Sequence, residues 1–365
     1  MYKILVINPG STSTKIAVYD DETPLIEKTL RHDSDIMDSF NSITDQYEFR
    51  KDVILKELNK EGINVKDLDA VVGRGGMVYP IESGVYEVND LLKRDLKNAV
   101  MGEHASNLGG LIADDIASSV GDIKAYIADP VVVDELQDVA RITGHPLLPR
   151  QSKFHALNQK AVARRYAKNS GVKYEDINLI VAHMGGGISV GAHYHGRIID
   201  VNNALDGFGP FSPERAGTVP AGKLVDLCFN GDYSKEEIKL MITGKGGLVA
   251  HLGTNQAHVA TERAEKGDEK ADLIIRAMAY QVAKAIGSAS VVLKGEYNQI
   301  ILTGGMANNP VVLRHIKEYI DFMGKLTIYP GEDEMEALSL NVLSVLRNEM
   351  ESKEYNPKMI NSASV

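Results

Sequence analysis

Residues 4–15 read ILVINPGSTSTK, and residues 179–192 read LIVAHMGGGISVGA. In both stretches a short apolar run leads into a glycine-rich polar turn, and a β-prone run follows. When the two apolar runs are superposed, Gly10 falls on Gly185. The shared pattern predicts a duplicated α/β domain with one glycine turn in each copy.

The composition is that of an ordinary globular protein. The chain has 365 residues, a length typical of two domains, and a net charge of −10, which argues against sequence-independent binding of nucleic acid. Cys228 is the single cysteine, so no internal disulfide can form. No apolar run is long enough to span a bilayer or to form a secretory signal. We therefore expect a cytoplasmic protein without a membrane partner.

Three glycine-rich turns follow predicted strands, at residues 8–13, 183–187 and 304–305. Glycine lets backbone N–H groups approach phosphate oxygens closely. Each turn alone is more often just a turn, but three in one chain favour a phosphate ligand. None has the P-loop or the G-x-G-x-x-G pattern, so we expect neither of those nucleotide folds.

Charged side chains in unusual loops suit the capture of an anion. Arg74 lies in GRGG after a predicted strand, and Arg215 lies in GPFSPERAG (residues 209–217). Arginine binds carboxylate or phosphate through paired hydrogen bonds, although most arginines are surface residues. Asp129 ends a strand before Pro130, where it fits a Mg²⁺ ligand and a helix cap equally well. No spacing of a zinc site or of a serine hydrolase occurs.

Taken in order, these motifs resemble the acetokinase family of acetate, propionate and butyrate kinases, within the superfamily of sugar kinases, heat-shock chaperones and actin. The resemblance runs from Asn8 to about Arg347. It is carried by NPGSTSTK, AHMGGGIS and ILTGGMANN, and the GRGG and GPFSPERAG loops resemble those of the butyrate-specific members. FHALNQ departs from the family pattern, because Gln159 stands where the family has a second histidine.

The resemblance implies roles for the matching residues. The implied catalytic residues are Asn8, Arg74, Asp129, His155 and Arg215. The implied nucleotide and phosphate ligands are Ser11, Ser13, Lys15, His183, Gly185, Gly186, Gly187, Gly304, Gly305 and Asn308. The implied substrate pocket contains Gly76, His104, Phe154 and Ala204. ATP or ADP and Mg²⁺ are the implied cofactors, with Asn8, Asp129 and Glu334 as metal-site residues and Asp333 as the alternative to Glu334.

The implied reaction is reversible, in-line, Mg²⁺-assisted transfer of the ATP γ-phosphoryl group to butyrate. A carboxylate acceptor is already ionised at neutral pH, so no general base is needed. Gly76 stands where acetate kinases have a valine, and we expect the lost volume to admit a longer alkyl tail. Each buried CH₂ contributes about 0.8 kcal/mol, so we expect preference rather than exclusivity.

The resemblance also implies the architecture. We expect two ribonuclease-H-like domains of the actin-like ATPase type, each with a mixed five-stranded sheet and flanking helices, and a cleft between them. Residues 1–150 with about 340–365 would form the N-terminal acyl kinase domain, and residues 151–339 the nucleotide-binding domain. A homodimer or higher homo-oligomer is the family expectation.

Other functions stay open at this stage. A kinase for acetate, propionate or isobutyrate has the same motifs, and a non-catalytic ATP switch of the same superfamily would share the glycine turns. A sugar or polyphosphate enzyme would need an acid beside the acceptor hydroxyl, and none is evident. The sequence also leaves open the physiological direction and the choice between Mg²⁺ and Mn²⁺.

Overall fold

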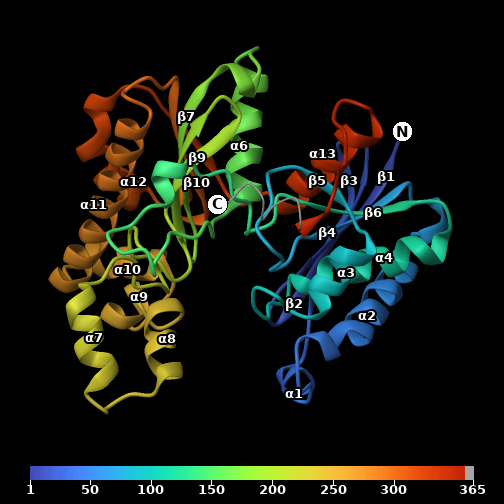
Figure 1. The fold of residues 1–365 in the computed structure, drawn as a ribbon, viewed down its shortest axis with the longest axis horizontal. Coiled ribbons are helices and arrows are strands. Elements are labelled where there is room, and N and C mark those ends of the chain that lie inside the picture. The colour runs from blue at the N-terminus through green and yellow to red at the C-terminus, as the bar shows by residue number, and fades with distance from the viewer. Residues whose placement is uncertain (358–365) are drawn as a thin grey trace. The chain divides into compact units, whose positions relative to one another are not determined.

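The computed structural model describes residues 1–357, which form two compact units (Figure 1). Within the described residues, unit 1 comprises Met1–Val133 and 333–357, and unit 2 comprises Asp134–Glu332. The last part of the expected N-terminal domain, residues 358–365, lies outside the described residues. The chain crosses between the units at 133–134 and 332–333, compared with 150–151 and about 340 in the division based on the sequence.

Unit 1 is built on a mixed sheet whose order is β12-β5-β6-β4-β1-β2-β3. Its strands are β1 (Lys3–Pro9), β2 (Ser13–Asp20), β3 (Thr23–Arg31), β4 (Ala70–Arg74), β5 (Val85–Glu87), β6 (Lys124–Ala128) and β12 (Lys353–Glu354). Its helices are α1 (Ser34–Asp38), α2 (Tyr47–Lys60), α3 (Asp90–Lys97), α4 (Asn107–Val120) and α13 (Glu334–Leu346). Strands β1, β4 and β6 run parallel, so their carboxyl ends share one edge.

Unit 2 is built on a sheet of order β11-β10-β7-β8-β9. Its strands are β7 (Asn178–Met184), β8 (Ile188–Tyr194), β9 (Arg197–Val201), β10 (Gln299–Gly304) and β11 (Leu326–Pro330). Its helices are α5 (Asp138–Arg141), α6 (Ala156–Asn169), α7 (Ala221–Phe229), α8 (Lys235–Thr243), α9 (Gly247–Leu252), α10 (Ala257–Glu265), α11 (Glu269–Val292) and α12 (Pro310–Ile320).

The two sheets repeat one frame, as the sequence predicts. In each, an antiparallel three-strand meander (β1-β2-β3 or β7-β8-β9) is extended by two parallel strands (β4 and β6, or β10 and β11). The expectation of five strands holds for unit 2 and is wrong for unit 1, where the described residues form seven. Two short strands widen that sheet: β5 pairs with β6, and after α13 the chain places Lys353 of β12 beside Tyr86 of β5.

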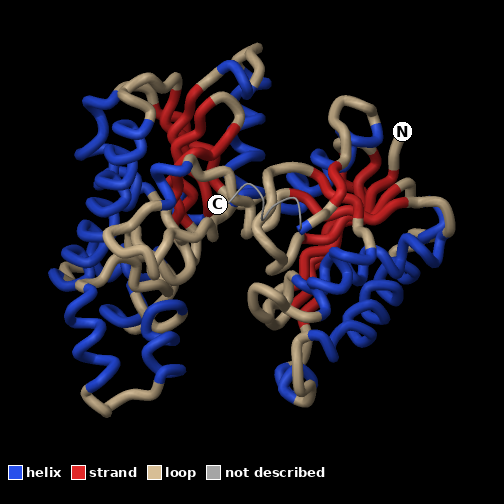
Figure 2. The backbone as a smooth tube through the Cα atoms, viewed as in Figure 1, coloured by secondary structure: helices blue, strands red, loops and turns tan. Residues whose placement is uncertain are grey.

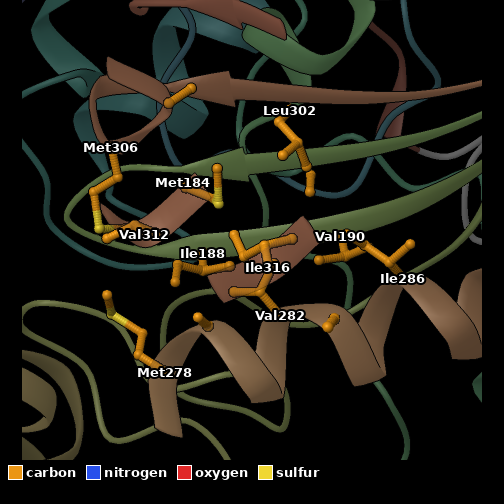
Figure 3. Close-up of a cluster of buried hydrophobic side chains, with 14 of the residues drawn as sticks. Met184, Ile188, Val190, Met278, Val282, Ile286, Leu302, Met306, Val312 and Ile316 are labelled. Atoms are coloured by element: carbon orange, nitrogen blue, oxygen red, sulfur yellow. The ribbon is translucent and has the colours of Figure 1, made fainter. Parts of the chain in front are cut away.

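The central strands are buried almost continuously, because helices cover the faces of each sheet. Strands therefore lie at the centre of each unit with helices around them (Figure 2). In unit 1, Leu5 and Ile7 pack toward the helices α2 and α4, in one buried cluster with Leu58 and Ile112. In unit 2, α11 and α12 pack against the sheet through Met278, Val282, Ile286, Val312 and Ile316 (Figure 3). Each such fully buried side chain contributes about 1.5–3 kcal/mol to stability. Across residues 1–357, no helix is long and apolar enough to cross a membrane.

Two glycines let β4 and α4 approach closely. A Cβ atom on Gly73 would overlap the backbone of Gly109 and Gly110, and one on Gly109 would overlap the backbone of Arg74. The strand end that carries Arg74 therefore lies directly on the helix α4. The pair fixes where the arginine backbone lies within unit 1.

We expect Gly109→Ala to lower the free energy of unfolding by at least about 2 kcal/mol, because the added methyl group meets backbone that cannot rotate away. Gly287→Ala is the matched control, since a Cβ there meets nothing within 4 Å. In a helix interior this change should stabilise by up to about 1 kcal/mol. Urea unfolding measures both; equal effects would contradict the close-packing argument.

Candidate active site

Three predicted residues of unit 1 lie at the carboxyl ends of adjacent parallel strands. Asn8 is near the end of β1, Arg74 is the last residue of β4, and Asp129 follows β6. The register pairs Ile7 with Gly73 and Arg74 with Ala128, so the three lie along one edge. Ligands of open α/β sheets bind at such edges.

Glu334 joins this edge from the far end of the chain. Its Oε2 accepts hydrogen bonds from Arg74 Nη1 at 2.9 Å and Asn8 Nδ2 at 2.8 Å. Arg74 Nη1 also lies 3.4 Å from Asn8 Oδ1. Glu334 is the first residue of α13, where the helix dipole favours a carboxylate, and Asp333 is the N-cap. Glu334 is therefore the C-terminal acid that contacts the other predicted residues.

Arg74 keeps most of its hydrogen-bonding capacity. Of its five N–H donors, those on Nε and Nη2 take part in no hydrogen bond within residues 1–357. The ion pair with Glu334 fixes one side of the guanidinium group. The opposite side of the fork remains able to bind a carboxylate or phosphate through two parallel bonds.

Asp129 is a buried carboxylate in a strained backbone. Its φ is +39°, in the left-handed region that few non-glycine residues adopt. Its Oδ1 accepts hydrogen bonds from Ser83 Oγ at 2.6 Å and from Gly84 N at 2.9 Å. These bonds orient the carboxyl group at the end of β6.

The β1–β2 turn carries the first predicted phosphate motif. Ser11 and Lys15 are exposed and Ser13 is half-buried. Lys15 pairs with Asn8 across the two strands, so the motif adjoins the edge described above. Glycine closes the turn: Gly10 N donates to Ser13 O at 2.8 Å.

Two predicted pocket residues of unit 1 have structural contacts. His104 is exposed and its Nδ1 accepts from Ser106 N at 3.1 Å, at the start of α4. A Cβ on Gly76 would lie 2.6 Å from Asn107 Cα and 2.6 Å from Leu96 Cδ2. The space beside Gly76 is thus filled by protein, and the absent side chain leaves no open volume there.

In unit 2 the rings of His155 and His183 stack at 3.9 Å with an angle of 16°. His183 Nδ1 lies 2.8 Å from the Asn158 carbonyl oxygen Oδ1, which makes Nδ1 the donor. His183 Nε2 is buried without a hydrogen-bond partner in the described part of the chain, 3.4 Å from Glu332 Oε1. The pair presents two histidines at the β7–β8 turn.

A buried chain of hydrogen bonds orients His155. Gln159 Nε2 donates to Ser189 O at 3.1 Å and to Ser189 Oγ at 2.8 Å, and Ser189 Oγ lies 2.9 Å from His155 Nδ1. Because Ser189 Oγ accepts from Gln159, its own proton is best used on His155 Nδ1. The neutral His155 ring then carries its proton on Nε2.

The same glutamine determines the state of a second histidine. Gln159 Oε1 lies 3.0 Å from His193 Nε2, and Tyr174 Oη lies 2.7 Å from His193 Nδ1. Burial, and then the charges of Lys160 and Arg164, hold the pKa of His193 well below its usual 6.5. His193 is therefore neutral, with its proton on Nε2. Sequence reasoning noted Gln159 only as a substitution, and it missed Ser189 and His193.

Arg215 packs onto the glycine turn of the same unit. Its Nη1 donates to Ala204 O, and a Cβ on Gly187 would overlap the guanidinium group. Burial lowers the pKa of Arg215, while Glu214 and Asp206 act in the opposite direction. Phe154 is buried. The residue before it, Lys153, accepts a hydrogen bond at its carbonyl oxygen from Ala204 N at 2.8 Å.

A cavity of about 570 Å³ in unit 2 is lined by several predicted nucleotide residues. Gly185, Gly186, Gly305 and Asn308 are among them, whereas Gly187 and Gly304 are not. Gly304, at φ +89°, instead meets the Met184 backbone closely. Asn255, His258, Thr261 and Glu262 also line the cavity. No motif marks these four residues, so they could not be predicted from the sequence.

A family model and a curated relative both indicate the same family. A family model of the acetokinase family matches residues 141–337. The chain is 57% identical over 354 residues to butyrate kinase 2 of Clostridium acetobutylicum, covering 97% of this chain and 99% of that protein.

Solved structures give the same fold. The chain is similar to acetate kinase of Porphyromonas gingivalis, with a TM-score of 0.77 and 20% identity, covering 95% of this chain and all of the other. A propionate kinase of Francisella tularensis gives a TM-score of 0.72 and 20% identity, covering 93% and 99%. These likenesses confirm the predicted actin-like ATPase fold.

The buried His193 makes stability depend on pH. Its pKa is lowered in the folded state, so below about pH 6.5 the unfolded chain binds more protons. The free energy of unfolding should then fall by up to about 1.4 kcal/mol for each pH unit as the pH drops from 6.5 toward 5.

Substituting this histidine should remove its share of that slope, so we expect His193→Gln to unfold with a weaker dependence on pH than the unmodified chain. His145→Gln, which changes an exposed histidine, is the control and should keep the full slope. Chemical unfolding at pH 7, 6 and 5 measures this. An unchanged slope in His193→Gln would show that the buried ring is not the cause.

Proposed function

The chain belongs to the acetokinase family, and we propose that it transfers the γ-phosphoryl group of ATP to butyrate, giving butyryl phosphate and ADP, and catalyses the reverse reaction. Members of this family are phosphotransferases with a carboxyl group as acceptor, and they use ATP and ADP. The chain is therefore a carboxylate kinase. The choice of butyrate and the roles of individual residues are the proposal.

The polar cluster of Asn8, Arg74 and Glu334 is the observation that carries the proposal. Phosphoryl transfer needs alignment of the reactants and positive charge at the equatorial oxygens. Arg74 is held by Glu334 at 2.9 Å while its Nε and Nη2 donors face no partner within the described residues. We assign those donors to the butyrate carboxylate and the transferred phosphoryl group.

His155 and Arg215 supply further donors in this proposal. With a proton of His155 on Nε2, this nitrogen is a hydrogen-bond donor. Such a preoriented donor stabilises charge that develops in the transition state. Arg215, aligned by Ala204 and Gly187 within unit 2, is assigned to phosphate binding. The cavity of unit 2 lined by Gly186, Gly305 and Asn308 is assigned to the nucleotide.

The oxygen ligands at the unit 1 edge fit Mg²⁺. Asn8 Oδ1 and the Glu334 carboxylate are within one hydrogen-bonded cluster, and Asp129 ends the neighbouring strand. Mg²⁺ prefers such hard oxygen atoms and takes only one or two carboxylates beside water and phosphate. When bound, the ion would offset negative charge on the phosphate oxygens. Among the described residues no cluster of three or more His, Cys, Asp or Glu side chains suits a metal, so the proposed ion would rely on phosphate and water for its other ligands.

The preference for butyrate is supported by the similarity of the chain to a butyrate kinase over nearly its full length. Gly76 does not support a preference for butyrate, because Asn107 and Leu96 fill the space beside that glycine. The homo-oligomer, the cytoplasmic location and the assignment of one domain to the acid and the other to the nucleotide also stay predictions.

The reaction is tested with ATP, Mg²⁺ and a panel of acids, by trapping the acyl phosphate as its hydroxamate. We expect kcat/KM to be highest for butyrate, with isobutyrate, valerate and propionate lower by roughly 10- to 200-fold at most, because one methylene discriminates only that far. A maximum at acetate would keep the enzyme class and refute the choice of butyrate.

Arg74→Ala tests the role of Arg74 in the same assay. It should lose acyl phosphate formation while binding ATP as before, since the nucleotide cavity lies within unit 2. Undiminished turnover in this variant would refute the role of Arg74. A protein that binds ATP and forms no product with any acid would instead be an ATP switch.

A further inference from the structure

Arg50 is a completely buried cation beneath the β1–β2 turn. It lies in the first turns of α2, and its side chain is 0% exposed. Nη1 donates to Ser13 O at 3.1 Å and Thr14 Oγ1 at 3.0 Å, and Nη2 donates to Ser11 O at 3.1 Å. The guanidinium group thus binds the turn from its inner side.

Gln46 satisfies the remaining donors. Its Oε1 accepts from Arg50 Nε at 3.1 Å and from Nη2 at 2.8 Å. All five N–H groups of Arg50 therefore have acceptors. Every one of these acceptors is neutral, and the described residues include no carboxylate in an ion pair with Arg50.

The neighbouring histidine adds no charge. Because Thr14 Oγ1 accepts from Arg50, its own proton goes to His32 Nε2, which lies 2.8 Å away. Burial and the charge of Arg50 lower the pKa of His32 to about 4. Burial also lowers the pKa of Arg50, to about 10, so the arginine stays charged at neutral pH. The cluster therefore carries one uncompensated positive charge.

The contacts of Arg50 also orient the turn. In a trans peptide the C=O and N–H groups point in opposite directions. With Ser11 O directed at Arg50, the N–H of Thr12 points to the other side, where Ser11 and Lys15 are exposed. Thr12 N–H takes part in no hydrogen bond within residues 1–357. The outer side of the turn thus combines an unused donor with a buried positive charge behind it.

A buried charge without a counter-ion is costly unless something else compensates it. We propose that Arg50 is a positioning residue that prepares the turn of residues 10–14 for a phosphate group and that its charge is compensated by this phosphate. The inference rests on the proposed function, because it concerns the phosphate handled by that reaction. The glycine turn could be predicted as a phosphate site from its motif. Arg50 lies 37 residues beyond Ser13, and no motif marks it.

Gln46→Glu separates the charge of Arg50 from its structural role. A glutamate keeps the oxygen atom Oε1 that accepts from both Nε and Nη2, and it places a negative charge against the guanidinium group. We expect the thermal midpoint to stay equal or rise. We expect kcat/KM for ATP-dependent butyryl phosphate formation, and the affinity for inorganic phosphate measured by calorimetry, each to fall about tenfold.

Gln46→Met makes the opposite change, since it removes the acceptor and leaves the charge. It should lower the thermal midpoint and leave kcat/KM of the folded protein nearly unchanged. Asn59→Asp is the matched charge control, because it adds one negative charge at the exposed far end of the same helix. It should change neither quantity.

The outcomes distinguish this inference from the proposed function. If Gln46→Glu is as stable as the unmodified chain and equally active, the charge of Arg50 is not used and the inference is wrong. The inference is also wrong if Gln46→Met loses activity as strongly as Gln46→Glu. If the unmodified chain forms no acyl phosphate, the proposed function fails, and the calorimetric binding of inorganic phosphate still tests Arg50 on its own.

Discussion

The ion pair between Arg74 and Glu334 connects two residues that are 260 positions apart. It forms because the chain returns to unit 1 after unit 2 and starts α13 at the ends of the parallel strands. The same carboxylate oxygen also holds Asn8. The orientation of the Arg74 and Asn8 side chains therefore depends on a contact between segments that are far apart in the sequence.

The candidate site uses cations that are held mainly by neutral groups. Arg50 is bound by carbonyl, hydroxyl and amide oxygens, and Arg215 donates to a backbone carbonyl. Of these three arginines, only Arg74 has a carboxylate within ion-pair distance among residues 1–357, and that carboxylate is proposed to share a metal ion. Such an arrangement suits a substrate with several negative charges, because the protein itself leaves the positive charges of these arginines largely uncompensated.

The ring nitrogen that carries the proton in each buried histidine is determined by its hydrogen-bonded neighbours. Each such chain of contacts starts from a group that can act only as a donor or only as an acceptor. A backbone carbonyl can only accept, so it fixes the amide of Gln159, which in turn sets His193 and, through Ser189, His155. Thr14 sets His32 in the same way. The proton positions are thus determined by buried contacts from several elements.

These features explain what the sequence could predict. The strand–turn–strand repeat, the glycine turns and Arg74 at a strand end are local patterns, and the structure has the strands where those patterns predicted them. Arg50, Ser189 and the cavity residues of 255–262 carry no local signal, because their roles depend on packing between distant elements. Gly76 illustrates the reverse case: its substitution suggested an empty space, and only the structure shows that Asn107 occupies it.

In this proposal Arg74 and Glu334 act as one unit, and a double-mutant cycle measures the coupling between them. Arg74→Met, Glu334→Gln and the double variant would be compared by kcat/KM for butyryl phosphate formation. We expect each single change to lower kcat/KM by at least about a hundredfold. The double variant should be little less active than the less active of the two single variants, as for residues that function together. Losses that multiply in the double variant would show that the two residues act independently and would contradict the account.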